Sequence, residues 1–312
     1  MSGVLPGRRS IRPRIVAALV CCVCVFAADR ACARVEVVDD TGAAVVLAAP
    51  ARRIVSLAPH TTELLFAAGA GDRVVGAVEY SDYPAAAKTL PRVGSSSLLD
   101  MERIAALKPD LVVVWRSGTS AARVEAIRAL GIPVYFNEPH TLAGIAATLV
   151  KLGTLAGTGD EARRAAETFT TRMDALRERY ARRRAVPLFW QVWARPLLTI
   201  NGRHVISDAV RLCGGVNVFA GLAPLVPAVT VEAVVAADPE AIVTTGSDAT
   251  AAHDDGLELW RELPRMRATS RGNLIVLDAD AIHRQSARVL DGVEALCARL
   301  DDVRMRSGAA AR

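Results

Sequence analysis

Short apolar runs alternate with helical patterns along most of the chain. In the first half, the strand-like runs cover 54–57, 74–78, 111–115 and 133–136, and the helical patterns cover 61–68, 100–107, 121–130 and 142–155. After residue 186 the same alternation returns, with runs at 188–192, 205–212, 231–237, 241–245, 274–277 and 287–300. Strands that are apolar throughout and alternate with helices are typical of a mainly parallel sheet covered on both faces. The pattern predicts an α/β fold that is built twice.

The segment between the two halves predicts one long helix. Its apolar residues follow a spacing of 4, 3, 4, 3, 4, which gives a single stripe on a charged helix over 160–184: Ala162, Ala166, Phe169, Met173, Leu176 and Tyr180. Such a helix is about 36 Å long at 1.5 Å per residue. Because neither Gly nor Pro interrupts it, we expect a rigid connector across both lobes, with an ordinary surface helix of one domain as the alternative.

An internal repeat supports two lobes of one design. The stretch 101–113 (MERIAALKPDLVV) returns as 231–243 (VEAVVAADPEAIV). Glu102 and Glu232 are 130 positions apart, and so are Pro109 and Pro239. We therefore divide the chain into an N-terminal extension (34–52), an N-terminal lobe (53–157), an interlobe helix (158–185), a C-terminal lobe (186–304) and a tail (305–312).

The first 33 residues have the pattern of an export signal. Four arginines precede an apolar run over 15–28, and Ala31-Cys32-Ala33 closes the segment, which predicts a signal peptide cleaved after Ala33. The apolar run is shorter than the ~20 residues that span a bilayer, so an uncleaved anchor helix is the weaker alternative. A lipid anchor is disfavoured because none of the cysteines before residue 33 follows a Leu-small-small triplet. We expect a protein of the periplasm.

Composition then excludes several classes. The 312 residues are 52% hydrophobic and 23% charged, which excludes a disordered chain and a polytopic membrane protein. The formal charge of +5 falls to +1 without residues 1–33, and the longest basic run left is Arg182–Arg184. We therefore expect no nucleic-acid partner.

Two cysteines, Cys213 and Cys297, remain after the predicted cleavage. A disulfide between them suits an oxidising compartment, and two buried thiols are the alternative.

The residues that follow the predicted strands are candidates for ligand binding, because open α/β sheets bind ligands at the carboxyl ends of their strands. Aromatic and basic side chains gather there, although aromatic residues make up 4% of the chain: Tyr80, Tyr83, Trp115, Arg116 and Trp193, with His60 beside the first strand. Aromatic faces together with arginine suit a large, flat, partly apolar ligand. The alternative is that each ring fills the core at its strand end.

Glu102 and Glu232 each follow an N-cap residue, Asp100 or Thr230, by two positions. The dipole of a helix N-terminus favours an acid there, which explains either residue by itself. The same acid on both lobes predicts in addition a partner with two matching basic patches.

Motifs of catalysis and metal binding are absent from the mature sequence. There is no Gly-x-Ser-x-Gly, phosphate-binding loop, His-Glu-x-x-His or Cys-x-x-Cys. The five histidines (His60, His140, His204, His253 and His283) lack the spacing of metal ligands, and we expect no bound metal. His60 and His283 follow strands and could approach the cleft, and His253-Asp254-Asp255 resembles a solvated loop.

Four stretches identify a resemblance: 54–66 (IVSLAPHTTELLF), 80–84 (YSDYP), 101–118 (MERIAALKPDLVVVWRSG) and 212–219 (LCGGVNVF). Together they resemble the substrate-binding proteins of ABC importers that have one long interlobe helix, and among these the cobalamin-binding branch. The resemblance runs from about Arg53 to Leu300.

The resemblance implies roles for particular residues. Tyr80 and Trp115 match positions that line the corrin site, and Trp193 lies where an aromatic residue of the second lobe is expected. Glu102 and Glu232 match acids that dock on arginines of the membrane permease, and Cys213 and Cys297 match a disulfide. Ser96, Val226 and Ala281-Ile282 stand where a related receptor has aromatic residues, so the pocket has less indole surface.

We therefore expect a non-enzymatic, monomeric periplasmic receptor that delivers cobalamin or a related corrinoid to an ABC permease and its ATPase, with no cofactor of its own. One alternative is a receptor for haem or a ferric siderophore, with an iron ligand from Tyr80, Tyr83 or His60. The other is a chelatase-like two-lobed enzyme that uses His60 or His283.

Overall fold

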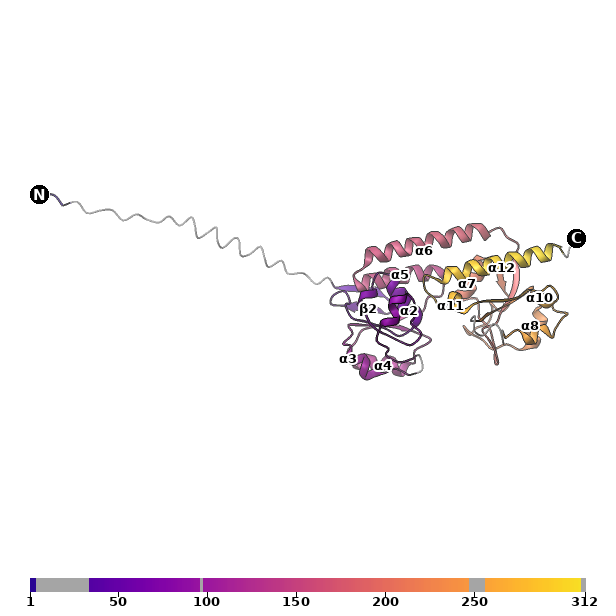
Figure 1. The fold of residues 1–312 in the computed structure, drawn as a ribbon, viewed down its shortest axis with the longest axis horizontal. Helices are drawn as coiled ribbons and strands as arrows, with labels where there is room; N and C mark the ends of the chain where they lie inside the picture. Colours follow the sequence, from indigo (N-terminus) through magenta and orange to yellow (C-terminus); the bar gives the residue numbers. More distant parts are fainter. Residues whose placement is uncertain (4–33, 96–97, 247–255, 310–312) are drawn as a thin grey trace.

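The computed structural model describes residues 1–3, 34–95, 98–246 and 256–309. Figure 1 shows two lobes side by side beneath a layer of long helices that spans both. Residues 4–33 of the expected signal peptide, Ser96 and the loop around His253 lie outside the described residues. No described helix combines the length and the apolarity that crossing a bilayer requires.

The N-terminal lobe contains one four-stranded sheet. Its strands are β3 (Ile54–Ser56), β4 (Val74–Ala77), β5 (Leu111–Trp115) and β6 (Val134–Asn137), all parallel, in the order β4-β3-β5-β6. The helices of this lobe are α2 (Pro59–Ala67), α3 (Met101–Ala106), α4 (Ala121–Ala129) and α5 (Leu142–Ala156), with 3₁₀ turns at Gly71–Arg73 and Ala85–Thr89. Separate apolar clusters pack on the two faces of the sheet, which explains why its strands are apolar throughout.

The C-terminal lobe repeats this sheet. Its strands are β7 (Val186–Trp190), β10 (Gly215–Asn217), β11 (Ala241–Gly246) and β12 (Leu274–Asp278), again parallel, in the order β10-β7-β11-β12. The helices are α7 (Val205–Leu212), α8 (Val231–Ala237), α9 (Glu258–Arg261), α10 (Arg267–Ser270), α11 (Ala279–His283) and α12 (Val289–Ala309). A short hairpin of β8 (Trp193–Ala194) and β9 (Leu197–Leu198) follows β7.

The two sheets share one connectivity, which confirms the fold class predicted from the sequence. In each lobe the strands lie in the order second, first, third, fourth. The repeat extends to the backbone, because Lys108 and Asp238 both have a positive φ (46° and 39°) at the ends of α3 and α8. Each precedes a proline, Pro109 or Pro239, whose ring disfavours the right-handed helical region for the residue before it.

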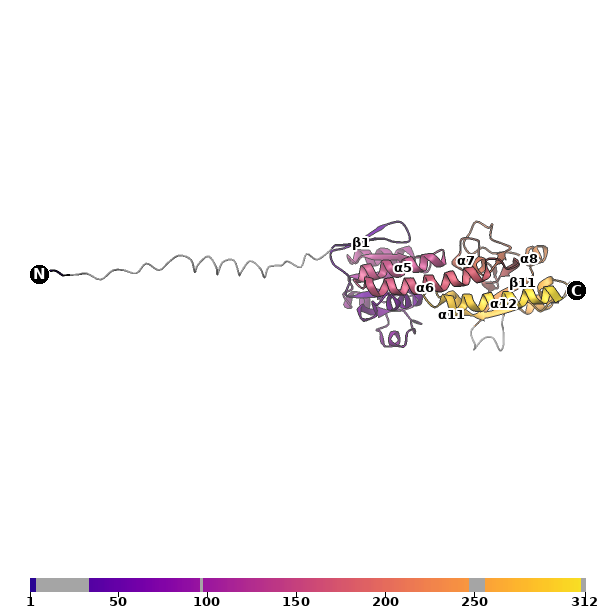
Figure 2. The same ribbon diagram turned by 90° about the horizontal axis from the view of Figure 1, so that it is seen from above.

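Helix α6 (Gly159–Tyr180) connects the lobes. All six residues of the predicted stripe are buried, and the helix packs along α5 and α2 at one end and along α12 and α7 at the other (Figure 2). On its exposed side, Arg172 forms ion pairs with Asp291 (2.7 Å) and Glu294 (2.8 Å) of α12. The helix ends four residues before the predicted Arg184, because Tyr180 is its last apolar contact with the core. Arg184 instead binds Glu240 at 3.0 Å.

A hairpin precedes the first lobe. Its strands β1 (Val35–Val38) and β2 (Ala44–Leu47) are antiparallel and form a two-stranded sheet of their own. Alternate residues (Val35, Val45 and Leu47) are buried in the core that includes α5. The hairpin therefore packs on the lobe and does not extend its main sheet.

Candidate functional site

Trp115 is the last residue of β5, and its half-buried indole is held on three sides. The indole nitrogen donates a hydrogen bond to Oε1 of Glu138 (3.3 Å), and the ring meets His60 edge to face at 5.5 Å between centroids. Gly118 covers one face so closely that a Cβ there would lie 2.0 Å from Cε3 of the indole. The orientation of this side chain is therefore fixed before any ligand arrives.

His60, in the first turn of α2, is buried and neutral. Its Nε2 lies 3.1 Å from Oδ1 of Asn137 at the end of β6. Burial lowers the pKa of His60 to about 4, because the imidazolium would lose its hydration. His60 thus supports Trp115. The sequence allowed His60 to approach the cleft, but in the structure its side chain is buried.

Tyr80 and Tyr83 follow β4 and differ in their surroundings. Tyr80 has a positive φ of 63°, a region that costs energy for a bulky residue, and its side chain is 77% exposed. The next residue, Ser81, is buried and accepts hydrogen bonds from Thr62 and Arg92, which holds this turn in place. Tyr83 is 45% exposed and carries the guanidinium of Arg288 over its ring at 3.8 Å.

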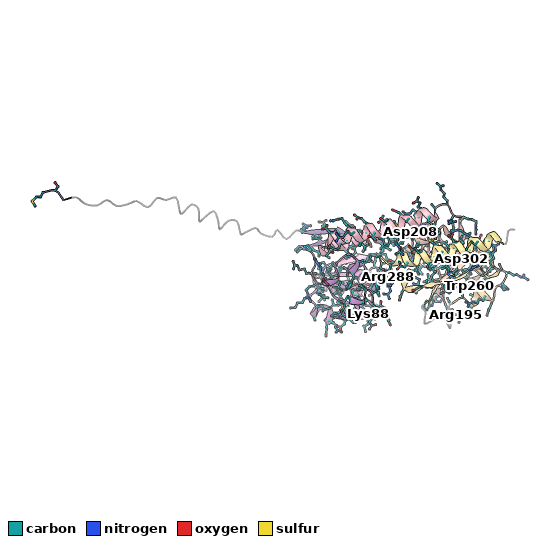
Figure 3. All side chains as sticks on the ribbon, turned by 45° about the horizontal axis from the view of Figure 1, so that its top comes forward. Lys88, Arg195, Asp208, Trp260, Arg288 and Asp302 are labelled. Carbon is teal, nitrogen blue, oxygen red and sulfur yellow. A yellow bond between two sulfur atoms is a disulfide. The ribbon has the colours of Figure 1, made fainter. Side chains whose placement is uncertain are left out.

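The contact of Tyr83 belongs to an ion cluster that joins the lobes. Glu63 on α2 is buried and accepts hydrogen bonds from three residues between α11 and α12: Arg284 (3.0 Å), Ser286 (2.6 Å) and Arg288 (2.7 Å). Arg284 also pairs with Asp82 at 2.7 Å, which lowers the pKa of that carboxyl against its partial burial. Arg288 lies where the two lobes meet in Figure 3.

Trp193 lies on the C-terminal lobe, in the β8–β9 hairpin after β7. Its side chain is 59% exposed, and its indole nitrogen donates to the carbonyl of Arg195 at 2.9 Å. The strand end before it is fixed by Gln191, which accepts a hydrogen bond from buried Trp260 (2.6 Å) and donates to Gly256 (2.6 Å). Both lobes thus present an aromatic side chain at a carboxyl strand end.

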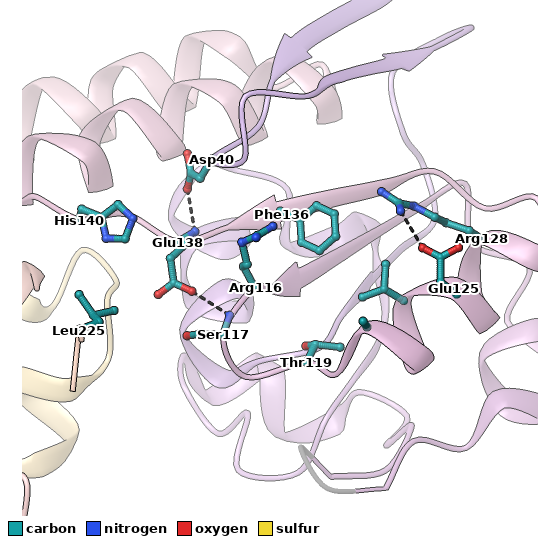
Figure 4. A pocket seen from close by; sticks show the side chains of 12 residues that line it. Asp40, Arg116, Ser117, Thr119, Glu125, Arg128, Phe136, Glu138, His140 and Leu225 are labelled. Carbon is teal, nitrogen blue, oxygen red and sulfur yellow. Dashed lines mark hydrogen bonds and ion pairs between the residues drawn. The ribbon is translucent and has the colours of Figure 1, made fainter. Parts of the chain in front are cut away.

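A cavity of about 530 Å³ lies beside this region, lined by the turn after β5, by α4 and by the end of β6. Figure 4 shows Arg116, Glu138 and His140 around it, with Leu225 approaching from the other lobe. Arg116 is exposed, and its guanidinium lies 5.9 Å from the centroid of Phe136. Trp115, its neighbour in sequence, is not among the residues that line this cavity.

Glu102 and Glu232 are both exposed in the first turns of α3 and α8. The caps are those expected, since Asp100 and Thr230 accept hydrogen bonds from Arg103 N (2.9 Å) and Ala233 N (3.2 Å). Hydrogen bonds from its own backbone N–H and from Thr230 lower the pKa of Glu232. Figure 1 shows both helices on the side of the molecule that faces away from α6.

Cys213, at the end of α7, and Cys297, on α12, are joined by a disulfide and are fully buried in the structure. Two of the other described histidines, His204 and His283, have structural contacts, while His140 is exposed and lines the cavity beside Arg116. His204 caps α7 by accepting from Ile206 N (3.1 Å), and burial lowers its pKa to about 4. His283 contacts Thr245 at 3.2 Å, and burial lowers its pKa as well. Among the residues that the structure describes, no cluster of potential ligands could hold a metal ion.

Sequence reasoning missed the polar residues that hold this site together: Asp40, Glu63, Asn137, Glu138, Arg284 and Arg288. Two signals were available. Glu63 is the one acid of its predicted helix and directly precedes the apolar run Leu64-Leu65-Phe66, and Asn137-Glu138 stands at the end of a predicted strand as Trp115-Arg116 does. Their partners lie as many as 225 residues away, so the sequence could not identify the pairs.

Comparison with known proteins decides the family. The profile described as periplasmic binding protein matches residues 54–281. The chain belongs to this family. It is 38% identical over 253 residues to the vitamin B12-binding protein of Yersinia pestis. The aligned region covers 81% of this chain and 88% of that protein.

Solved structures agree with this membership. The crystal structure of the periplasmic vitamin B12 binding protein BtuF of Vibrio cholerae matches at 35% identity with a TM-score of 0.74, covering 82% of this chain and 98% of that one. A periplasmic haem-binding protein of Roseiflexus matches at 23% identity with a TM-score of 0.71, covering 81% and 98%, and shows the common fold alone. Periplasmic binding proteins are non-enzymatic components of transport, so the chelatase-like alternative is wrong.

Proposed function

We propose that this protein captures cobalamin or a related corrinoid between its lobes and delivers it to an ABC importer. The observation that carries the proposal is an aromatic side chain at a carboxyl strand end of each lobe: the fixed, half-buried indole of Trp115 and the exposed indole of Trp193. The identity of 35–38% to vitamin B12-binding proteins supports a corrinoid as the ligand.

A corrin ring is broad, planar and largely apolar at its faces, so preorganised aromatic side chains suit it. Tyr80, exposed in the turn after β4, adds a third ring, and Tyr83 and His60 contact Arg288 and Trp115. The positions that lack an aromatic residue differ in their surroundings, since Val226 is exposed and Ile282 is fully buried. We propose that the loss of indole surface at Val226 weakens contact with the ring and leaves its orientation to Trp115 and Trp193.

A haem or siderophore receptor remains the alternative ligand class on the same fold. It needs an iron ligand, and two of the three candidates are engaged in the structure. His60 has its Nε2 on Asn137 inside the lobe, and Tyr83 lies under the guanidinium of Arg288. Tyr80 alone of the three has a largely exposed side chain.

We propose that Glu102 and Glu232 dock on basic residues of the permease. Each acid stands on a capped helix turn, and α6 holds the two lobes at a nearly constant separation, which suits a partner with two matching patches. The importer's ATPase is then the energy source, and this protein contributes binding alone.

We also propose, from the sequence, that the protein is exported through a signal peptide cleaved after Ala33. It is then a soluble monomer of the periplasm without a lipid anchor. Its lobes are limited to 53–157 and 186–304. The oxidising periplasm suits the link between Cys213 and Cys297. Mass spectrometry of the exported protein with thiol alkylation checks both the new N-terminus and the disulfide.

The proposed ligand is tested by titrating the purified protein with cyanocobalamin and, separately, with haemin, while the visible absorption bands are followed. We expect cyanocobalamin to bind saturably at one site. We expect no haem binding through Tyr80, so that any shift of the haem Soret band is the same in the wild type and in Tyr80→Phe. Tight haem binding without a response to corrinoid would overturn the assignment.

A further inference from the structure

The hairpin of residues 34–47 reaches the cavity beside Arg116 through one side chain. We propose that Asp40, in the turn between β1 and β2, is a positioning residue that fixes Trp115 and His60. The relevance of this role for ligand binding rests on the function proposed above, while the positioning itself does not.

Asp40 contacts the carboxyl end of β6 with both its backbone and its carboxylate. Its backbone N–H donates to the carbonyl of Phe136 (3.1 Å), and Oδ2 accepts from Glu138 N (2.8 Å) and Asn137 Nδ2 (3.3 Å). Its other oxygen, Oδ1, accepts from Lys151 Nζ on α5 at 3.0 Å. Three donors from β6 and α5 thus converge on one carboxylate, which is largely buried.

The first route leads from Asp40 to His60. A carboxylate can only accept hydrogen bonds, so Asn137 must turn its Nδ2 toward Asp40 and its Oδ1 toward the other side. Thr148 favours the same orientation of Asn137 more weakly. Its hydroxyl donates to the carbonyl of Gly144 and so accepts from Asn137 Nδ2, at 3.4 Å. Oδ1 of Asn137 faces Nε2 of His60, and this fixes the neutral imidazole as the tautomer with its proton on Nε2.

The second route leads to Trp115. Asp40 holds the backbone N–H of Glu138, and the side chain of Glu138 accepts from the indole nitrogen of Trp115 (3.3 Å) and from Ser117 N (2.8 Å). Because Ser117 lies in the turn that carries Gly118 over the indole, Glu138 fixes both the edge and the covered face of Trp115. Asp40 therefore stands behind both partners of the His60–Trp115 contact, although it touches neither ring.

The matched control is Lys151. Lys151→Ala removes the ion pair between the hairpin and α5 but leaves Oδ2 of Asp40 on Glu138 and Asn137. A hairpin that merely anchors the lobe predicts similar effects for Asp40→Ala and Lys151→Ala. A positioning role predicts that Asp40→Ala alone changes the site. Asp40→Asn keeps the shape of the side chain but has one acceptor oxygen for the three donors that Asp40 binds. This variant therefore tests the positioning role if Asp40→Ala does not fold.

The first measurement needs no ligand. In ¹⁵N-histidine spectra, with the His60 signal assigned by its loss in His60→Gln, we expect the Nε2-protonated tautomer in the wild type and in Lys151→Ala, and a mixture of tautomers in Asp40→Ala. Acrylamide quenching is followed in a Trp193→Phe background, where Trp115 is the accessible indole because Trp190 and Trp260 are fully buried. Quenching should rise in Asp40→Ala and stay constant in Lys151→Ala. Unchanged tautomer and unchanged quenching in Asp40→Ala and Asp40→Asn would overturn the proposal.

The second measurement is titration with cyanocobalamin. We expect Kd to rise about tenfold in Asp40→Ala, which corresponds to roughly 1.4 kcal/mol, and to stay within twofold in Lys151→Ala. A shifted tautomer with an unchanged Kd would overturn the link between this positioning and binding. If the wild type does not bind cyanocobalamin, the proposed ligand is wrong, and the spectra still decide the role of Asp40.

Discussion

Among single residues, ligand binding depends most on how firmly Trp115 is held. Gly118 has a backbone that alanine can adopt, since its φ is not in the left-handed region, but an alanine Cβ would overlap the indole. We expect Gly118→Ala to displace Trp115 and to weaken corrinoid binding roughly tenfold, a loss near 1.4 kcal/mol. Gly221→Ala is the control, because a Cβ at that position would have no atom within 4 Å. Equal affinities of the two variants, measured by absorption titration, would show that the fixed indole is not needed.

The buried imidazole of His60 gives the folded protein a pH dependence of known sign. Burial lowers its pKa from 6.5 to about 4, so the unfolded chain takes up a proton at a higher pH than the folded protein does. The contribution to stability is therefore full above pH 6.5 and is lost as the pH falls toward 4, by about 3 kcal/mol. Urea unfolding at pH 7, 6, 5 and 4.5 should show a shallower decline in His60→Gln. Parallel curves for wild type and variant would contradict the assignment.

The positions of the exposed site candidates were easier to predict from the sequence than their supports. Trp115, Tyr80 and Trp193 lie at or after strand ends as expected, because the strands were visible as apolar runs. The environment of His60 was not predictable, because its burial depends on Asn137, 77 residues away. Arg116 was grouped with Trp115 in the sequence but lines a cavity that Trp115 does not, since neighbouring residues at a strand end point to opposite sides.

Among the helices and strands, apolar periodicity predicted the elements with large buried faces. The interlobe helix is the clearest case, because every residue of its stripe is buried. β10 was missed because its three residues include a glycine and carry no apolar run, and parallel pairing with β7 alone defines it. The β8–β9 hairpin has two residues in each strand, too few for a pattern to repeat.

The most consequential link between elements is Glu63 on α2 with the segment between α11 and α12. Removing the charge of Glu63 leaves Arg284 and Arg288 without their buried partner, and breaking a buried pair costs about 3–5 kcal/mol. We expect Glu63→Gln to lower the free energy of unfolding by about 3 kcal/mol in urea titrations. Asp280→Asn is the control, because this acid pairs with Arg284 at the exposed surface, where a pair contributes at most about 1 kcal/mol. Similar losses in both variants would contradict the special role of the buried carboxylate.

Taken as a whole, the molecule must bind its ligand and its importer with different surfaces. Glu102 and Glu232 stand on α3 and α8, on the side away from α6, and neither belongs to the proposed ligand-binding residues. Glu102→Arg with Glu232→Arg should leave corrinoid affinity unchanged and reduce uptake by the cognate importer in vesicles by roughly tenfold, because like charges then meet at the interface. Glu178→Arg, on exposed α6, is the control. Uptake that the double variant does not change would rule out these acids as docking residues.

The proposed function requires that one corrinoid lies between the lobes and contacts both. Calorimetric titration of cyanocobalamin into the wild type, Trp115→Ala and Trp193→Ala is the sharpest test, since each indole belongs to a different lobe. We expect one site per chain in the wild type and a loss of affinity of about tenfold or more in each variant, as is usual for a buried aromatic contact. No binding by the wild type, or an affinity that Trp193→Ala leaves unchanged, would contradict this arrangement.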